Sequence, residues 1–192
     1  MIATSLENNP TVQRLREHLP TAVAKAESSR GEVTLWIEAQ SLVEACRRLR
    51  DDAALQYNFL SDLTAVDYVR LPQYPRFVVV YHLYSLPLKH RVRLKVVAQG
   101  DPPSVPSVVS IWSTANWHER EVFDLFGIHI TGHPDLRRIM MPDDWEGHPL
   151  RKDYPEGRQE VAFSYNTPAF PEHRAHMRRV RPEQPPAKEG RP

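Results

Sequence analysis

The segment from Trp117 to Pro155 constrains this chain more than any other part of its sequence. It combines acids, bases, aromatic residues, glycines and prolines in an order that no generic fold requires. Because charged groups are costly to bury without partners, we do not expect such a segment inside the chain's own core. It must stay in water or contact another protein, and its five aromatic residues favour contact with another protein.

The composition excludes several classes of function. The 192 residues suit one medium-sized domain with an appendage, and 41% of them are hydrophobic, which is enough for a core. A formal net charge of +1, from 25 basic and 24 acidic residues, gives no electrostatic reason to expect nucleic acid or an anionic membrane as partner. The single cysteine, Cys46, excludes a disulfide framework, and an iron–sulfur cluster or thiolate-rich zinc site made by this chain alone. We expect a reducing compartment.

The sequence indicates no direct attachment to a membrane. Its first residues lack the basic flank and apolar run of a signal peptide. The most apolar stretch, Phe77 to Leu86, is too short and too polar to span a bilayer. We expect any link to the membrane to come through partner proteins.

The first fifty residues are expected to form a helix, a strand and a second helix. Asn9 and Pro10 are typical of an N-cap and a first helical position. Alternating apolar residues over 33–37 indicate a strand. The residues at 41–44 read Ser-Leu-Val-Glu, which predicts a capping box for the next helix. Cys46 falls on the apolar stripe of that helix, so we expect it in the core.

Three strands over 57–68, 76–84 and 90–98 are expected next, joined as a meander. In the third strand three apolar residues point one way, and Arg91, Arg93 and Lys95 point the other. Residues 101–106 should form a proline-rich turn. A helix over 115–126 should follow, ended by Gly127. These elements predict an α+β fold with helices packed on a mostly antiparallel sheet.

The pattern changes after Gly127, where prolines recur and apolar periodicity is lost. We expect a globular α+β domain over residues 1–130 and a long extended, partner-binding segment over 131–192. About fifteen residues at the C-terminal end are expected to be disordered unless a partner orders them.

The helix predicted over 115–126 carries charges that suggest an interface. Glu119 falls inside its apolar arc, where a carboxylate must be paired or must face another protein. Arg120 and Asp124 lie on the opposite side, four residues apart, and can pair with each other. Trp117 lies with them, where a large ring is out of place unless another surface covers it. The alternative is a salt-bridged surface helix with one exposed tryptophan.

No constellation of residues indicates catalysis or a metal site. His118 and Glu119 could begin a zinc-protease helix, but Val122 stands where a second histidine is required. His129 and His133 are four residues apart, yet a glycine and a proline beside His133 disfavour the helix that would bring them together. The sequence contains no phosphate loop, dinucleotide-binding glycine fingerprint or nucleophilic serine elbow.

Residues 143–154, here called the strap, have the composition of a catalytic loop but not the rigid neighbours that a catalytic site needs. Proline and glycine favour an extended path, along which donors and acceptors alternate. This pattern predicts a strap that lies across a partner, with Trp145 and Tyr154 as anchors. An ordinary mobile loop is the alternative.

Three motifs make the chain similar to a known family. They read EREVFDLFGI at 119–128, GHPDLRRI at 132–139 and MPDDWEGHPLRKDYP at 141–155. Together with FLSDLTAVDY and the strand pair around VVVYHLYS and HRVRLKV, they resemble the 30 kDa subunit family of respiratory complex I, the NADH:quinone oxidoreductase. The resemblance covers roughly residues 55–155, and is weak after Pro155.

The resemblance implies a non-catalytic scaffold subunit in the peripheral arm of a proton-translocating enzyme, where it supports electron transfer from NADH to quinone. It implies no cofactor in this chain, with FMN and iron–sulfur clusters in partner subunits. The implied partners are the quinone-site 49 kDa-type protein, which is the D subunit of the enzyme, and the neighbouring iron–sulfur proteins, its B and I subunits. The implied location is peripheral, on the cytoplasmic side of the cell inner membrane.

The residue patterns and the resemblance together predict partner contacts and no catalytic, cofactor-binding or metal-binding residue. Three glycines, at 127, 132 and 147, are expected to serve backbone turns. The predicted contact residues are Trp117, Glu119, Arg120, Glu121, Asp124, Phe126, Gly127, His133, Asp135, Arg137, Arg138, Asp144, Trp145, Glu146, Gly147, His148, Pro149, Arg151, Lys152, Asp153 and Tyr154.

Three other interpretations stay open. The first is the equivalent subunit of a membrane-bound hydrogenase related to complex I. The second is a small nucleic-acid-binding domain that uses the face with Arg91, Arg93 and Lys95, although that face lacks interleaved aromatic residues. The third is a free-standing hydrolase.

Overall fold

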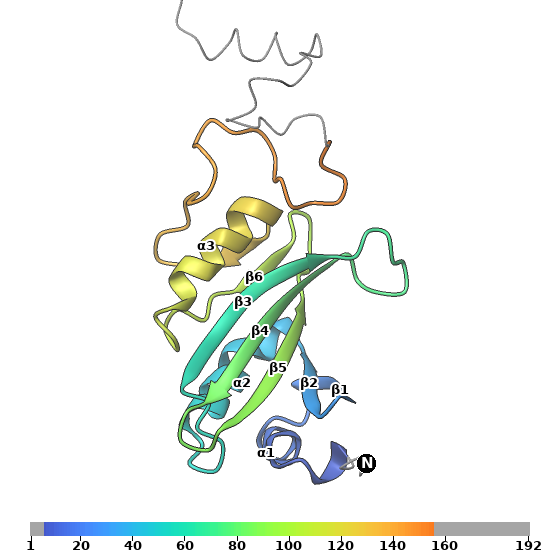
Figure 1. The fold of residues 1–192 in the computed structure, drawn as a ribbon, viewed down its shortest axis with the longest axis vertical. Coiled ribbons are helices and arrows are strands. Elements are labelled where there is room, and N and C mark those ends of the chain that lie inside the picture. Colours follow the sequence, from blue (N-terminus) through green and yellow to red (C-terminus); the bar gives the residue numbers. More distant parts are fainter. Residues whose placement is uncertain (1–5, 156–192) are drawn as a thin grey trace, which may run out of the picture. The chain divides into compact units, whose positions relative to one another are not determined.

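The computed structural model describes residues 6–155 and begins with a capped helix (Figure 1). A 3-10 turn, η1 (Leu6–Asn8), leads into α1 (Pro10–His18). The Asn9 side chain accepts hydrogen bonds from the N–H groups of Thr11 and Val12, which confirms the predicted N-cap.

The second helix, α2 (Leu42–Asp51), forms where predicted but starts differently. The predicted capping box is wrong, because the Ser41 side chain makes no capping hydrogen bond. A 3-10 turn, η2 (Ala39–Ser41), runs directly into α2, so the Ser41 backbone is already helical. Glu44 instead pairs with Arg47 and Arg48 on the helix surface.

Five strands form the main sheet in the order β1-β2-β5-β4-β3. The pairing of β2 with β5 is parallel and the other three pairings are antiparallel, which confirms a mostly antiparallel sheet with a β3–β4–β5 meander. The strands are β1 (Val23–Ser29), β2 (Glu32–Ile37), β3 (Phe59–Asp67), β4 (Phe77–Ser85) and β5 (His90–Val97).

The sequence analysis missed β1, since its residues, VAKAESS, have weak strand propensity. The strand forms because Arg30 and Gly31, both with positive φ, make a tight hairpin turn that lays it against β2. Pairing with an ordered neighbour therefore overrides local preference.

A second, two-stranded sheet lies beside α3 (Ala115–Phe126). It joins β6 (Ser104–Pro106) to β7 (His129–Thr131) in parallel. The prediction of a turn over 101–106 is therefore wrong for its second half. Val105 and Ile130 pair across this sheet and are both buried, so burial stabilises an extended conformation there.

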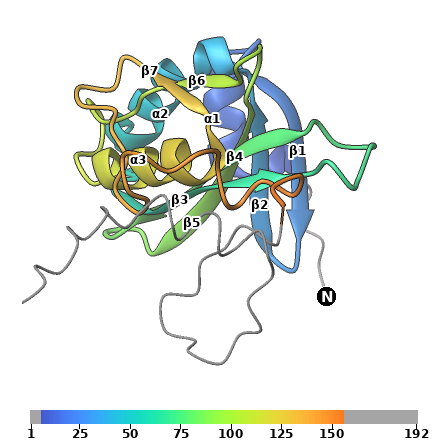
Figure 2. The ribbon, with the colours of Figure 1, turned by 90° about the horizontal axis from the view of Figure 1, so that it is seen from above.

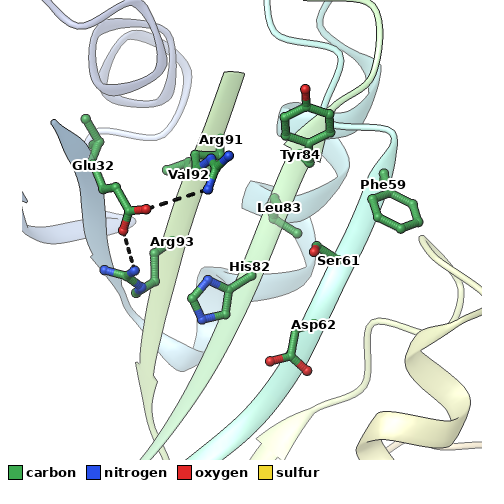
Figure 3. Close-up of a pocket in the computed structure, with 11 residues that line it drawn as sticks. Glu32, Phe59, Ser61, Asp62, His82, Leu83, Tyr84, Arg91, Val92 and Arg93 are labelled. Carbon is green, nitrogen blue, oxygen red and sulfur yellow. Dashed lines mark hydrogen bonds and ion pairs between the residues drawn. The ribbon is translucent and has the colours of Figure 1, made fainter. Parts of the chain in front are cut away.

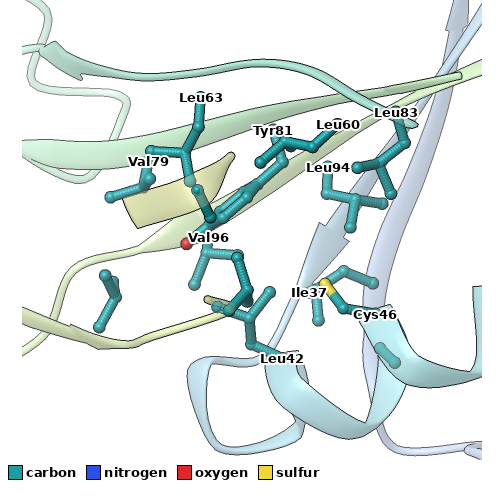
Figure 4. Close-up of a cluster of buried hydrophobic side chains, with 14 of the residues drawn as sticks. Ile37, Leu42, Cys46, Leu60, Leu63, Val79, Tyr81, Leu83, Leu94 and Val96 are labelled. Atoms are coloured by element: carbon teal, nitrogen blue, oxygen red, sulfur yellow. The ribbon is translucent and has the colours of Figure 1, made fainter. Parts of the chain in front are cut away.

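The helices lie on one face of the main sheet and enclose a core with it (Figure 2). Tyr81 and Leu94 pair across β4 and β5 inside this core, near the fully buried Cys46 of α2 (Figure 4). Burial raises the pKa of the Cys46 thiol, so the group stays protonated, as expected of a core residue.

After β7 the described chain continues to Pro155 without a further helix or strand, as predicted for an extended segment. The described residues through Tyr154 form one compact unit. No helix within residues 6–155 is long and apolar enough to cross a membrane. The prediction about the last fifteen residues falls outside the described part of the chain.

Candidate partner-binding surface

Glu119 of α3 is a buried carboxylate with partners in its own chain. It is 1% exposed and accepts hydrogen bonds from the Val108 N–H and the Ser107 hydroxyl, both at 2.7 Å. Burial raises the pKa of Glu119 to about 7, although these two hydrogen bonds oppose the shift. Of the two alternatives predicted for Glu119, the structure shows an internal pairing.

His133 lies beside this carboxylate, and its side chain is also buried. Its Nδ1 accepts the N–H of Asp135 at 3.0 Å, so the proton of the neutral ring is on Nε2. Nε2 lies 3.2 Å from the Asn116 carbonyl, to which it donates, and 4.0 Å from Glu119 Oε2. His133 therefore fastens the start of the extended segment to α3.

Asp124, further along α3, holds the loop at residues 137–141, here called the anchoring loop. Its Oδ2 accepts three successive N–H groups, from Ile139, Met140 and Met141, at 2.7–3.0 Å. Burial raises the pKa of the Asp124 carboxyl, but these N–H groups and Arg138 outweigh burial and leave the pKa below its ordinary value. Asp124 is therefore an ionised group that the folded chain needs.

Two arginines complete this connection. Arg138 Nη1 lies 2.6 Å from Asp124 Oδ1, and Arg138 Nη2 donates to the carbonyls of Trp145 and Gly147 in the strap. Arg120 donates to the carbonyls of Arg137 and Arg138. The predicted pairing of Arg120 with Asp124 is therefore wrong, because the anchoring loop supplies partners to both side chains.

The strap also covers the C-terminal end of α3. Gly127 has φ 68°, and a Cβ placed there would lie 2.4 Å from the His148 ring. His148 Nδ1 is 2.8 Å from the Asp124 carbonyl, and Arg151 donates to the carbonyls of Phe126 and Gly127. A glycine at position 127 is thus required by the backbone and by the close approach of the strap.

The far end of the strap meets the end of β3. Asp67 is 6% exposed and accepts the Lys152 N–H at 3.0 Å. Arg76, the residue before β4, pairs with both Asp67 and Asp153. The sequence analysis missed Asp67, Arg76 and Ser107 as contributors. Asp67 lies within the motif FLSDLTAVDY, but the motif does not indicate which group would bind it.

Several large apolar side chains of α3 and of the segment after it are exposed to solvent, although hydrogen bonds fix the backbone of that segment. Trp117 and Met140 are each 63% exposed, and Leu150 is 43% exposed. The predicted anchors Trp145 and Tyr154 are half-buried, and the buried Trp145 Nε1 has no hydrogen-bond partner among the described residues. Tyr154 packs against Gly147, where a Cβ would lie 2.9 Å from its ring.

The other predicted contact residues divide by exposure. Glu121 and Pro149 are half-buried, and Phe126 is in the core. Those exposed to solvent are Asp135, Arg137, Asp144, Glu146, Lys152 and Asp153. Contact of any of these residues with a partner stays a prediction.

The open face of the main sheet has a shallow hollow whose charges are largely paired (Figure 3). Glu32 pairs with both Arg91 and Arg93, and Lys95 lies 5.0 Å from the centre of the Trp36 ring. These pairings reduce the positive potential that a nucleic-acid interface needs. Within residues 6–155, no three His, Cys, Asp or Glu side chains are grouped to hold a metal ion.

The α+β fold and the motifs around α3 define a class of respiratory-complex subunit. The chain belongs to the family described as respiratory-chain NADH dehydrogenase, 30 Kd subunit, which matches residues 35–160. It is 50% identical to the C subunit of NADH-quinone oxidoreductase from Roseiflexus sp. (strain RS-1), over 84% of this chain and 92% of that protein. It is also 50% identical to the C subunit from Geobacter sulfurreducens, over 78% of this chain and 90% of that protein.

Two solved structures share the fold. The trypsin-resistant fragment of Nqo5 is 33% identical with a TM-score of 0.56, over 66% of this chain and 99% of that one. A chain of the membrane-bound sulfane sulfur reductase, an archaeal respiratory membrane complex, is 25% identical with a TM-score of 0.62, over 76% of this chain and 84% of that one. The predicted family is confirmed, and the chain is a subunit of NADH-quinone oxidoreductase within a membrane-associated complex.

Proposed function

We propose that this chain is a non-catalytic scaffold subunit in the peripheral arm of a proton-translocating NADH:quinone oxidoreductase. In this proposal it carries no cofactor, and FMN and the iron–sulfur clusters belong to partner subunits. The segment after α3 binds the quinone-site 49 kDa-type protein, the D subunit, and the iron–sulfur proteins that are the B and I subunits. The complex holds the chain at the cytoplasmic side of the cell inner membrane.

The proposal is carried by one contrast within residues 132–155: some side chains fix the backbone to α3, while large apolar side chains stay exposed. Three polar side chains of this segment, those of Arg138, His148 and Arg151, are directed toward α3, and together with Asp124 of α3 they fix the backbone. Large apolar side chains remain exposed on the fixed segment and on α3, as with Met140 and Trp117. A preorganised surface of this kind loses little conformational entropy on binding, which favours a stable protein interface.

The similarity to relatives favours this enzyme over a related hydrogenase. Identity of about 50% over most of the chain is found with proteins named as the C subunit of NADH-quinone oxidoreductase. Identity falls to 25% with the archaeal sulfane sulfur reductase chain. The names of these relatives support the respiratory enzyme, and none of the three is named as a hydrogenase.

Trp117→Ala combined with Met140→Ser should weaken assembly without unfolding the chain. Both side chains are exposed, so the melting temperature of the isolated chain should change by no more than about 2 °C. Truncating two interface anchors typically costs about 1–2 kcal/mol each, so the other subunits should dissociate from the tagged chain at least about tenfold faster.

Leu88→Ser provides a matched control, because Leu88 is 44% exposed and lies in the turn between β4 and β5, away from α3. Retention of the other subunits is measured by co-purification in mild detergent, with each subunit identified by mass. Equal retention by the double variant and by the control would contradict the proposal.

A further inference from the structure

The loop between β3 and β4, residues 68–76, is an ordered hairpin whose apolar residues face water. Figure 1 shows it, coloured teal to green, projecting beyond its neighbouring strands. Three of its side chains are large, apolar and more than two-fifths exposed: Val69 at 43%, Leu71 at 45% and Tyr74 at 42%. Exposed apolar side chains that are grouped in this way are typical of protein interaction sites.

Hydrogen bonds and ring stacking give this hairpin a defined shape. The Tyr68 N–H donates to the Arg76 carbonyl at 2.6 Å, and two further turns are closed by Leu71 and Tyr74. The rings of Tyr68 and Tyr74 stack with their centres 4.9 Å apart. The Asp67 side chain accepts the Val69 N–H at 3.0 Å, which fixes the start of the hairpin. The exposed side chains are therefore presented from a rigid base.

The base of the hairpin is continuous with the end of the strap. Asp67 accepts the N–H groups of both Val69 and Lys152, so one carboxylate holds the two segments together. Arg76 bridges the same carboxylate to Asp153. The hairpin and the end of the strap therefore form one continuous surface. A partner polypeptide that covers the strap near Leu150 and Asp153 would lie next to the hairpin.

We propose that the 68–76 hairpin is a second arm of the partner-binding surface, and that it contacts the same subunit of the complex that covers the end of the strap. This inference depends on the proposed function and extends it to residues outside the segment after α3. Arg70, exposed at the tip, forms no ion pair among residues 6–155. The matching site on the partner should therefore be apolar with an acidic rim.

Site-specific photo-crosslinking in the assembled complex tests the shared partner. A photoreactive phenylalanine analogue is placed at position 71 in the hairpin, at 150 in the strap, and at 88 in the turn at the opposite end of the sheet. Positions 71 and 150 should crosslink to one and the same subunit, identified by mass, and position 88 should not crosslink to it.

The possible outcomes separate this inference from the proposed function. A crosslink from position 150 without one from position 71, or crosslinks to different subunits or to a second copy of this chain, would overturn the inference and leave the proposed function standing. Crosslinks from neither position would contradict both the inference and the proposed function.

As a second measurement, Leu71→Glu should speed dissociation of that subunit about tenfold, while Leu88→Glu should not. The melting temperature of each variant chain should stay near that of the wild type.

Discussion

At the residue scale, Glu119 shows why a charged side chain in an apolar arc has to be interpreted with the whole chain in view. Helical periodicity places it correctly on the buried face of α3. Its partners, Ser107 and Val108, come from the preceding loop, twelve and eleven residues earlier. The sequence analysis left an internal partner and a foreign one open and favoured an interface, whereas the structure shows internal partners.

The raised pKa of Glu119 predicts a stability that depends on pH. Because the folded pKa of about 7 exceeds the ordinary value of 4.5, the stabilisation is fully present below pH 4.5 and is lost as pH rises through 7. The loss should be on the order of 3 kcal/mol at pH 8. Glu119→Gln does not titrate. Its amide oxygen can accept the Val108 N–H, and its amide nitrogen can donate to the Ser107 oxygen, which reverses that hydrogen bond. Its melting temperature should therefore rise relative to wild type between pH 5 and pH 8.

Thermal melts of both chains across this pH range provide the measurement. Glu121→Gln, on the same helix but half-exposed, is the matched control and should follow the wild-type curve. Parallel curves for wild type and Glu119→Gln would show that this carboxylate does not drive the pH dependence.

At the scale of elements, the segment after α3 has no regular structure beyond β7 and is nevertheless held firmly. One carboxylate, that of Asp124, accepts hydrogen bonds from three backbone N–H groups and from the guanidinium of one arginine, Arg138. From the end of β7 to Pro155 the segment has no helix or strand, as predicted, but its hydrogen bonds to its own domain were not predicted. A charge pattern does not reveal which backbone groups a carboxylate will bind, because that depends on how distant segments dock.

Asp124→Asn should release the anchoring loop. The asparagine side chain has one acceptor oxygen in place of two, and its NH2 group would face either the backbone N–H groups of the anchoring loop or the Arg138 guanidinium. Arg138 would then be a partly buried charge without its carboxylate partner. Breaking such a pair typically costs about 3–5 kcal/mol. Hydrogen exchange at Ile139, Met140 and Met141 should accelerate strongly, while exchange in β4 changes much less. Asp143→Asn, at an exposed position nearby, should leave all of these rates unchanged, and slow exchange in both variants would contradict the assigned role of Asp124.

At the scale of the whole molecule, the described residues contain a hydrophobic core together with the segment that lies over the end of α3. Helices α1 and α2 and the main sheet enclose that core, and the strap is fastened to β3 and α3 within the same unit. The stability of this unit should therefore be set by contacts among residues 6–155.

Removing residues 156–192 should leave the melting temperature of the isolated chain within about 2 °C of the full-length value, since no described core contact is lost. The same deletion should reduce co-purification of the other subunits, if the predicted partner-binding role extends through residue 192. Differential scanning calorimetry of the two chains and co-purification from the assembled complex measure the two effects. A drop of more than about 5 °C would show that the removed residues stabilise the domain.

The amino-acid sequence by itself determined the elements with strong periodicity: α1, α2, the β3–β4–β5 meander and α3, along with the family motifs. Their burial faces repeat every two or 3.6 residues, so neighbouring residues carry the information. Tertiary structure decided the weakly patterned strand β1, the pairing of Val105 with Ile130, and the partners of Glu119, Arg120 and Asp124. Those outcomes depend on groups far apart in the chain, whose contacts form only when the segments pack together.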